Sequence, residues 1–383
     1  MPEIKKDILS FQSQCIDAVR VLFVLILVLF HGFATTLSGF SFEDYPITEI
    51  FKRFVDTFFC GDSIVAVYFF ISGYLFFSGK DWTSDVYKEK LKRRIKTLLI
   101  PYLLWNLLGV CLVVVRLLPV FNIFLTYSGS DLNMSVSNFL SCFWMYDGQL
   151  GAPSESVGNY EIFVQRTCFP INTALWFVRD LMIVVACTPL VYFLLKRLRM
   201  YFIFLLSVLY LYFSYNVIYW HINQLLMAFL FFSWGAYLCL QKKIILNYFS
   251  RSWPIWGYLL CSILFLSVSY FAIKDVSPLF KAMHSFVTVA FAFNVVGRLS
   301  RYGSIQFRYG AAWSCFIYMS HCLVVPRMLK IVTFAITPAS DLAWLSTYIL
   351  SVILTLALLS LCFVLCRKYT PKLLNVFIGG RVR

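Results

Sequence analysis

Residues 20–31 read RVLFVLILVLFH, an unbroken apolar run with an ionisable side chain at each end. With its flanks the run extends over about 18–38, the length that an α-helix needs to cross the hydrocarbon core of a bilayer. It is too long for a cleaved signal peptide and lacks a clear small-residue cleavage site. We therefore predict a transmembrane helix here.

Nine further segments of the same character follow along the chain. The ten predicted spans are 18–38, 62–79, 97–118, 173–195, 200–216, 222–241, 253–273, 279–297, 310–331 and 341–366. The composition agrees, because 61% of the 383 residues are hydrophobic and only 13% are charged, whereas a soluble domain is closer to half apolar and about a quarter charged. We predict an all-α, polytopic membrane protein with about ten transmembrane helices. Residues 1–383 are expected to form one integral-membrane domain, with no fused soluble domain.

The basic residues are distributed unevenly between the loops. If the N-terminus is cytoplasmic, the inner segments hold 24 of the 33 Lys and Arg residues. Cytoplasmic loops carry such an excess, so both termini are predicted to lie inside. The net charge of +15 is spread between apolar runs, which argues against nucleic acid as a partner. The long connection 119–172 then lies outside, and loops of this length are often lids or binding segments.

The cysteines and histidines show no metal-binding pattern. Most of the 12 cysteines lie in apolar runs without CxxC spacing, so buried reduced thiols are expected. Cys60, Cys142 and Cys168 lie in predicted outer loops, and a disulfide among them stays open. The four histidines have neither HxxxH nor HxxE spacing, so we predict no metal site.

Arg20 and His31 are eleven positions apart, which places both side chains on one helix face, about 16 Å apart along the axis. Arg20 is predicted at the cytoplasmic rim and His31 near mid-membrane, where an ionisable residue is costly and usually functional. The structural alternative is a hydrogen-bonded histidine and an ordinary positive-inside arginine. Asp17 lies about 20 Å below His31, so any group that orients His31 must come from another helix.

A second group of candidates follows the predicted span 62–79. Residues 68–76 read YFFISGYLF, in which Ser72 and Gly73 allow a close approach between helices. Residues 88–96 read KEKLKRRIK, which is more basic than orientation requires. Such a density suits anionic lipid headgroups or the phosphates of a nucleotide-like cofactor, and the residues alone favour membrane lipids.

Five motifs occur in order along the chain. They are Arg20 with His31, FFISGYLF at 69–76, KRRIKTLLIPYLLW at 92–105, LWF at 175–177 and IYMSH at 317–321. Together they resemble the acyltransferase-3 family of bacterial membrane acyltransferases. The resemblance extends from about residue 14 to residue 366.

The resemblance implies an activity and several site residues. Members transfer an acyl group, usually acetyl from acetyl-CoA, to hydroxyls of surface or lipid-linked glycans at the bacterial cytoplasmic (inner) membrane. His31 would be the catalytic base or acyl relay, with Arg20 near the donor entrance and His321 as a secondary site. The basic residues expected near the CoA phosphates are Lys92, Arg93 and Arg94.

The chemistry of acyl transfer adds requirements. A thioester is already activated, so transfer needs a base for the hydroxyl proton and donors for the oxyanion. Ser72 or Tyr68 could supply such a donor. Arg179 and Asp180 are adjacent, so we expect their side chains on different faces of the helix. They would then either form ion pairs with other helices, or Arg179 would contact the substrate.

Two points of organisation stay open at this stage. Some family members carry an extra-membrane transferase domain at the C-terminus. Without one, this chain would deliver the acyl group directly, or act with a separate extracytoplasmic partner or as a homo-oligomer. The alternative function is a transporter or flippase of a lipid-linked sugar, and a sensor or scaffold is disfavoured by the intramembrane charges.

Overall fold

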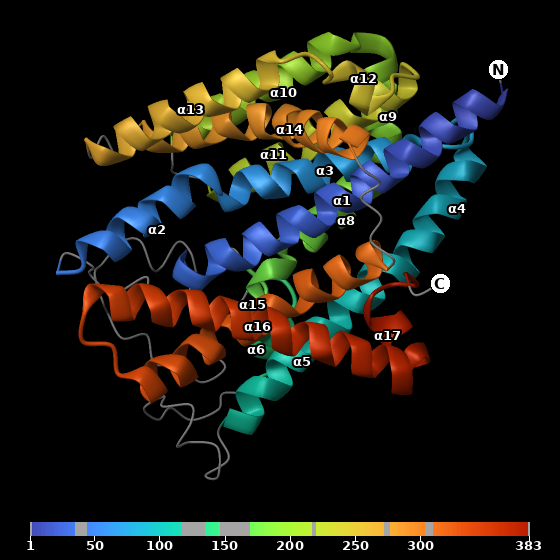
Figure 1. Cartoon of the computed structure of the whole chain (residues 1–383). Helices are drawn as coiled ribbons and strands as arrows, with labels where there is room; N and C mark the ends of the chain where they lie inside the picture. Colours follow the sequence, from blue (N-terminus) through green and yellow to red (C-terminus); the bar gives the residue numbers. More distant parts are fainter. Residues whose placement is uncertain are drawn as a thin grey trace.

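The computed structural model describes residues 2–34, 44–116, 135–145, 169–216, 220–271, 276–302 and 309–381, and the regular elements among them are all helices (Figure 1). The first half contains α1 (Pro2–Ala34), α2 (Pro46–Phe58), α3 (Gly61–Phe77), α4 (Ser84–Arg94), the π-helix η1 (Ile95–Leu99), α5 (Ile100–Arg116), α6 (Val136–Ser141), the 3-10 helix η3 (Thr173–Leu175) and α8 (Trp176–Ala186). The second half contains α9 (Thr188–Leu198), α10 (Met200–Tyr215), α11 (Trp220–Leu240), α12 (Ile245–Tyr248), α13 (Trp253–Tyr270), α14 (Ser277–Tyr302), α15 (Gly310–Ile336), α16 (Asp341–Tyr369) and α17 (Pro371–Phe377).

These helices confirm an all-α polytopic membrane protein. Within the described residues, eight helical stretches are long and apolar enough to cross a membrane, and a bent pair of helices can count as a ninth. The apolar helix α10 is shorter, with 16 residues. The ten predicted spans fall on these ten segments. Large apolar side chains are exposed on the outer helices α10, α13 and α16, for example Phe204, Leu260 and Ile353, as expected for surfaces that face lipid.

Two local features differ from the sequence-based prediction. The predicted span 173–195 is not one helix, because α8 and α9 meet at an angle of 64°. Pro189 occupies the first turn of α9, where its missing N–H and fixed φ favour a new helix start. The second feature is α2, which was not predicted because its apolar residues form one face of a short helix and not a continuous run.

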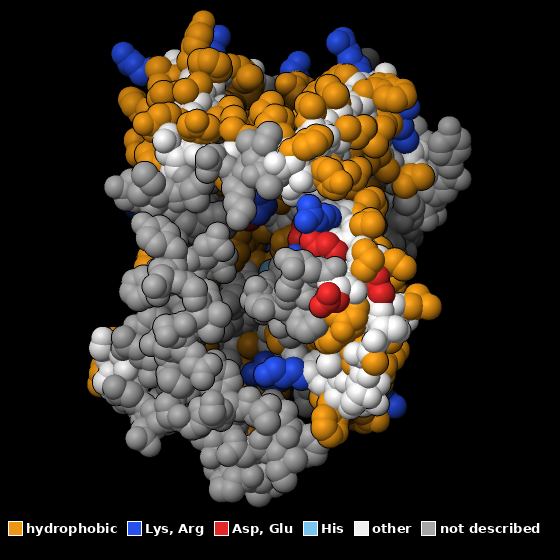
Figure 2. Space-filling view, turned by 90° about the vertical axis from the view of Figure 1, so that its left-hand side faces the viewer, with side chains coloured by type: hydrophobic (Ala, Val, Ile, Leu, Met, Phe, Trp, Pro, Cys, Tyr) orange, Lys and Arg blue, Asp and Glu red, His pale blue; other side chains and the backbone are white. Residues whose placement is uncertain are grey.

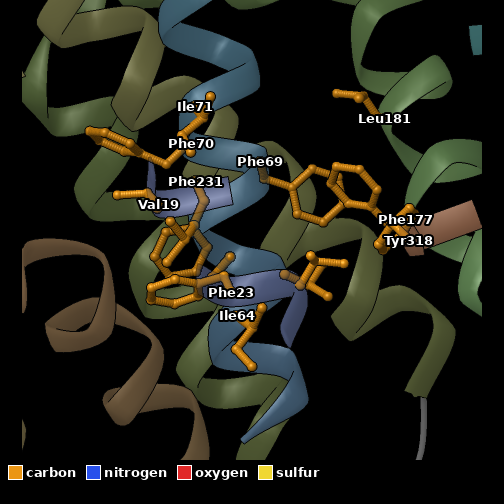
Figure 3. Close-up of a cluster of buried hydrophobic side chains, with 14 of the residues drawn as sticks. Val19, Phe23, Ile64, Phe69, Phe70, Ile71, Phe177, Leu181, Phe231 and Tyr318 are labelled. Carbon is orange, nitrogen blue, oxygen red and sulfur yellow. The ribbon is translucent and has the colours of Figure 1, made fainter. Parts of the chain in front are cut away.

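Helix α1 lies in the middle of the bundle, in contact with α3, α14, α15 and α16 (Figure 1). Both ends of the described chain lie at the same end of the bundle. Apolar side chains from α1, α3, α8, α11 and α15 fill the core beside α1 (Figure 3). In this position, side chains of α1 contact several other helices at once.

Two glycines allow α3 and α11 to pack with their backbones in contact. A Cβ atom on Gly73 would lie 2.0 Å from the Phe232 carbonyl oxygen, and one on Gly235 would lie 2.0 Å from the Phe70 carbonyl oxygen. Because both obstacles are backbone atoms, no rotamer change can relieve them. The absence of a side chain at Gly73 therefore allows α3 and α11 to approach each other closely.

Gly73→Ala is expected to lower the thermal stability of the detergent-solubilised protein. The added methyl group forces the two backbones apart, and overpacking of this kind costs about 1–3 kcal/mol or more. Gly257→Ala on α13 is the matched control, because its Cβ would make only an ordinary contact of 3.5 Å with Val287. Unchanged melting of Gly73→Ala would contradict the close packing.

Part of the predicted outer loop packs into the bundle. Residues 135–145 include α6 and the fully buried Cys142. The Tyr102 hydroxyl donates to the Phe143 carbonyl oxygen, and the Ile171 N–H donates to the Cys142 carbonyl oxygen at 2.9 Å. Cys60 and Cys142 are free thiols, whereas Cys168 lies outside the described residues. Figure 2 shows the end opposite the chain termini, where hydrophobic side chains cover the top and the right-hand side and acidic side chains lie to the right of the middle.

Candidate active site

A cavity of about 120 Å³ lies between α1, α3, α8, α15 and the end of the chain. Three arginines line it, namely Arg20, Arg94 and Arg381, and the described lining contains no acidic side chain. The remaining walls are largely apolar and aromatic. Three guanidinium groups around one small space favour an anion of several charges, because phosphates accept charge-assisted hydrogen bonds from arginine.

Arg20 reaches this cavity from the middle of α1. Its Nη1 donates to Asp17 Oδ1 at 2.9 Å, one turn earlier on the same helix. The Tyr68 hydroxyl donates to the Arg20 carbonyl oxygen at 3.0 Å, which ties α1 to α3. Asp17 thus holds Arg20 in place and neutralises only one of the three positive charges.

The basic run separates into exposed and inward side chains. Lys92 and Arg93 are exposed, whereas Arg94 lies at the cavity, with its guanidinium 5.7 Å from the Phe76 ring centroid. The π-helix η1 follows directly after Arg94, and π-helical turns are frequent at functional sites. The structure therefore places one of the three predicted residues, Arg94, in the cavity.

Arg381 was not among the predicted site residues. It follows α17 and two glycines with positive φ, Gly379 at 68° and Gly380 at 79°. A Cβ atom on Gly379 would lie 2.3 Å from the Thr97 carbonyl oxygen, so the turn packs against η1. This turn brings the end of the chain to Arg20 and Arg94. In the sequence Arg381 was counted only as an inner-loop charge.

The two predicted histidines meet deeper in the bundle. The ring centroids of His31 on α1 and His321 on α15 are 5.0 Å apart, and the ring planes are inclined by 48°. His321 Nδ1 lies 2.8 Å from the Tyr318 carbonyl oxygen. A carbonyl only accepts, so Nδ1 carries the hydrogen and Nε2 of neutral His321 keeps a lone pair.

Cys322 completes a group of three with these histidines. Its Sγ lies 3.3 Å from His321 Nε2. The potential ligand atoms of His31, His321 and Cys322 lie within 4.8 Å of one another. This group was not visible in the sequence, because His31 and His321 are brought together only by the packing of α1 against α15.

Phe177 and Tyr318 line the cavity, and Figure 3 shows them next to Phe69. Phe177 contacts Tyr318 with ring centroids 5.7 Å apart and Phe69 at 4.6 Å. Tyr68 and Ser72 from α3 also line the cavity. The hydroxyl hydrogen of Tyr68 is already donated to Arg20, which leaves Ser72 as the better candidate for an oxyanion donor.

Arg179 and Asp180 form a fully buried ion pair with each other. Arg179 Nε lies 2.8 Å from Asp180 Oδ1, and Arg179 Nη1 donates to the Trp144 carbonyl oxygen at 2.8 Å. The two residues thus form a structural ion pair with each other within α8, and a substrate role for Arg179 stays a prediction. The arginine side chain is long enough to fold back across the 100° that separates neighbours on a helix.

The remaining described histidine of the core, His284, has a structural environment. Its Nδ1 lies 2.9 Å from Ser63 Oγ, and its Nε2 lies 2.9 Å from Ser262 Oγ. Thr288 Oγ1 also lies 3.1 Å from Nδ1. His284 thus joins α3, α13 and α14 through hydrogen bonds.

The fold and the site together define a polytopic membrane protein with a basic cavity below a pair of histidines. Residues 13–366 match a family model described as an acyltransferase domain. The chain has no significant match among curated proteins or solved structures. Because the family match covers nearly the whole chain, the protein belongs to the acyltransferase-3 family and is a membrane-embedded transferase of acyl groups.

Proposed function

We propose that the protein moves an acyl group, with acetyl as the expected one, from cytoplasmic acyl-CoA to a hydroxyl of a surface or lipid-linked glycan. His31 serves as base or relay. The observation that carries this proposal is the arrangement along α1, with an arginine-lined cavity at Arg20 and a histidine pair at His31.

The cavity supports a phosphate-bearing donor. CoA carries several phosphate groups, and Arg20, Arg94 and Arg381 offer three guanidinium groups without a matching number of carboxylates. Arg20 and His31 are separated by about 16 Å along the helix axis. An extended pantetheine arm can cover that separation, so a donor held at the arginines can present its thioester near the histidines. Lys92 and Arg93 are placed to attract the donor from solution.

The histidine pair supports the proton transfer. In the proposed reaction His31 takes the proton of the acceptor hydroxyl while the oxygen attacks the acyl carbonyl carbon. The carbon–sulfur bond breaks, and the CoA thiolate leaves and receives a proton. Neighbouring hydrogen-bond donors stabilise the oxyanion, and Ser72 is the candidate for this role. His321, whose Nδ1 is held by the Tyr318 carbonyl oxygen, lies beside His31 with the ring centroids 5.0 Å apart.

The proposed direction of transfer follows the charge distribution. We place both termini, and hence Arg381 and the basic run, on the cytoplasmic side, where acyl-CoA is found. The inner bacterial membrane and the N-in, C-in orientation are part of this proposal. The acceptor would then approach from the opposite end of the bundle.

Membranes that contain the wild-type chain should incorporate label from radiolabelled acetyl-CoA into crude glycan, whereas membranes without the chain should not. No incorporation with any glycan would contradict the proposal and favour transport of a lipid-linked sugar. Mass spectrometry of surface glycans from a deletion strain would identify the acceptor, since the missing acetyl groups mark its position.

Arg381→Ala is expected to raise the KM for acyl-CoA roughly ten- to a hundredfold, with a smaller effect on kcat. A hydrogen bond to a charged group contributes about 1.5–3 kcal/mol, and each 1.4 kcal/mol corresponds to about tenfold in binding. Lys372→Ala is the matched control, because this exposed residue of α17 does not line the cavity. An unchanged KM in Arg381→Ala would remove Arg381 from the donor site.

A further inference from the structure

We propose that Cys322 forms a covalent intermediate in the transfer. Its thiol receives the acyl group from the donor thioester, and the acceptor hydroxyl then takes the acyl group from Cys322. The proposal rests on the acyl-CoA donor of the proposed function. It adds a reaction step and a nucleophile that the family match does not assign.

The arrangement around Cys322 is that of a nucleophile beside a general base. Its Sγ lies 3.3 Å from His321 Nε2, the nitrogen that keeps a lone pair. His321 is in turn oriented by the Tyr318 carbonyl oxygen, 2.8 Å from Nδ1. A nucleophile in contact with a base, and a base held by a third group, is the pattern of covalent catalysis.

A second set of contacts points to the sulfur from another element. The Thr173 side chain and the Ala174 backbone N–H are hydrogen-bond partners of Cys322. Both belong to η3, which leads directly into α8. Burial of the sulfur disfavours a thiolate, so the negative charge that appears on sulfur during exchange depends on these two donors and on His321.

Cys322 also lies on the helix face that lines the arginine cavity. Cys315 lines the cavity, and Cys322 follows seven residues later on α15. Seven residues bring the two side chains to nearly the same helix face, about 10 Å apart along the axis. Cys322 is thus about one to two turns beyond the cavity lining on the same face of α15, and His31 lies beside its neighbour His321.

The two steps balance. In the first, His321 Nε2 takes the Cys322 proton, the sulfur attacks the acyl carbon, the bond from that carbon to the CoA sulfur breaks, and CoA leaves with the proton as a free thiol. In the second, His31 takes the acceptor hydroxyl proton, the oxygen attacks the acyl carbon, and the Cys322 carbon–sulfur bond breaks. Cys322 then regains a proton. Exchange between two thioesters conserves the activation of the acyl group.

The test uses membranes with the full chain, radiolabelled acetyl-CoA and no glycan. Wild type should acquire label that neutral hydroxylamine removes, and mass spectrometry should locate an acetyl group on the peptide that contains Cys322. Cys322→Ala and Cys322→Ser should both lose this labile label. Cys362→Ala, a cysteine on α16, is the control and should be labelled like wild type. His31→Ala should retain the label and fail to discharge it when glycan is added.

Several results would contradict the acyl-Cys322 intermediate. One is a Cys322→Ser variant that folds like wild type and transfers acetyl to glycan at the wild-type rate, which would mean direct transfer and leave the proposed function intact. Another is activity that EDTA abolishes and Zn²⁺ restores without any acetyl-cysteine, since His31, His321 and Cys322 would then be metal ligands. If wild type neither labels nor acetylates glycan, the proposed function fails as well, which the glycan assay reports separately.

Discussion

Replacing His31 with alanine is expected to slow acetyl transfer to glycan by about 10²–10⁴-fold, the usual contribution of a general base. The loss should appear mainly in kcat, because Arg20, which is proposed to hold the donor, lies about 16 Å away along α1. The measurement is acetyl incorporation from radiolabelled acetyl-CoA in membranes that contain equal amounts of folded protein. Transfer at the wild-type rate in His31→Ala would rule out His31 as base or relay.

His284→Ala is the matched control for that variant. His284 is fully buried, as is His321 of the histidine pair, but its hydrogen bonds go to the hydroxyls of Ser63, Ser262 and Thr288. Its removal takes away the hydrogen bonds that join α3, α13 and α14 and leaves a cavity in the core, which costs stability. We expect lower thermal stability with unchanged transfer per folded molecule. If His284→Ala instead lost transfer activity at unchanged thermal stability, the catalytic role would belong to His284 and the structural role to His31.

The second large effect is expected at the buried ion pair. Arg179→Met removes the partner of the Asp180 carboxylate and the donor to the Trp144 carbonyl oxygen. Removal of one partner from a buried pair costs about 3–5 kcal/mol, because a charge stays buried without compensation. We expect a low yield of folded protein and a strongly reduced melting temperature in detergent.

Two further variants test the cause of that loss. The double variant Arg179→Met with Asp180→Leu should recover much of the stability, since apolar pairs of similar volume often replace buried ion pairs. Lys80→Ala, which breaks the exposed Lys80–Glu89 pair, should leave the melting temperature nearly unchanged. If Arg179→Met proved as stable as wild type but inactive, Arg179 would have the substrate role that the sequence left open.

Helix periodicity and hydropathy were sufficient to predict most of the membrane spans and the helix face shared by Arg20 and His31. The segments of about 20 apolar residues define the spans, and the eleven-residue spacing places Arg20 and His31 on one face of α1. Both inferences use information local to one helix. The break between α8 and α9 was missed because the apolar run continues across it, while the helix axis turns by 64°.

The contacts between helices needed the structure. His31 and His321 are nearly the whole chain apart, and no periodicity relates α1 to α15. Arg381 reaches the cavity only because Gly379 and Gly380 adopt positive φ, a conformation that glycine favours but does not require. The family motifs indicated that His31 and His321 matter; the packing of α1 against α15 puts their rings 5.0 Å apart.

The position of α1 has a consequence for how this protein tolerates change. The residues between Arg20 and His31 set the distance along α1 between the arginine-lined cavity and the histidine pair. Many apolar substitutions within it would preserve the length. Insertion or deletion of a single residue would rotate His31 by about 100° and shift it by about 1.5 Å relative to Arg20, so length is more constrained than composition.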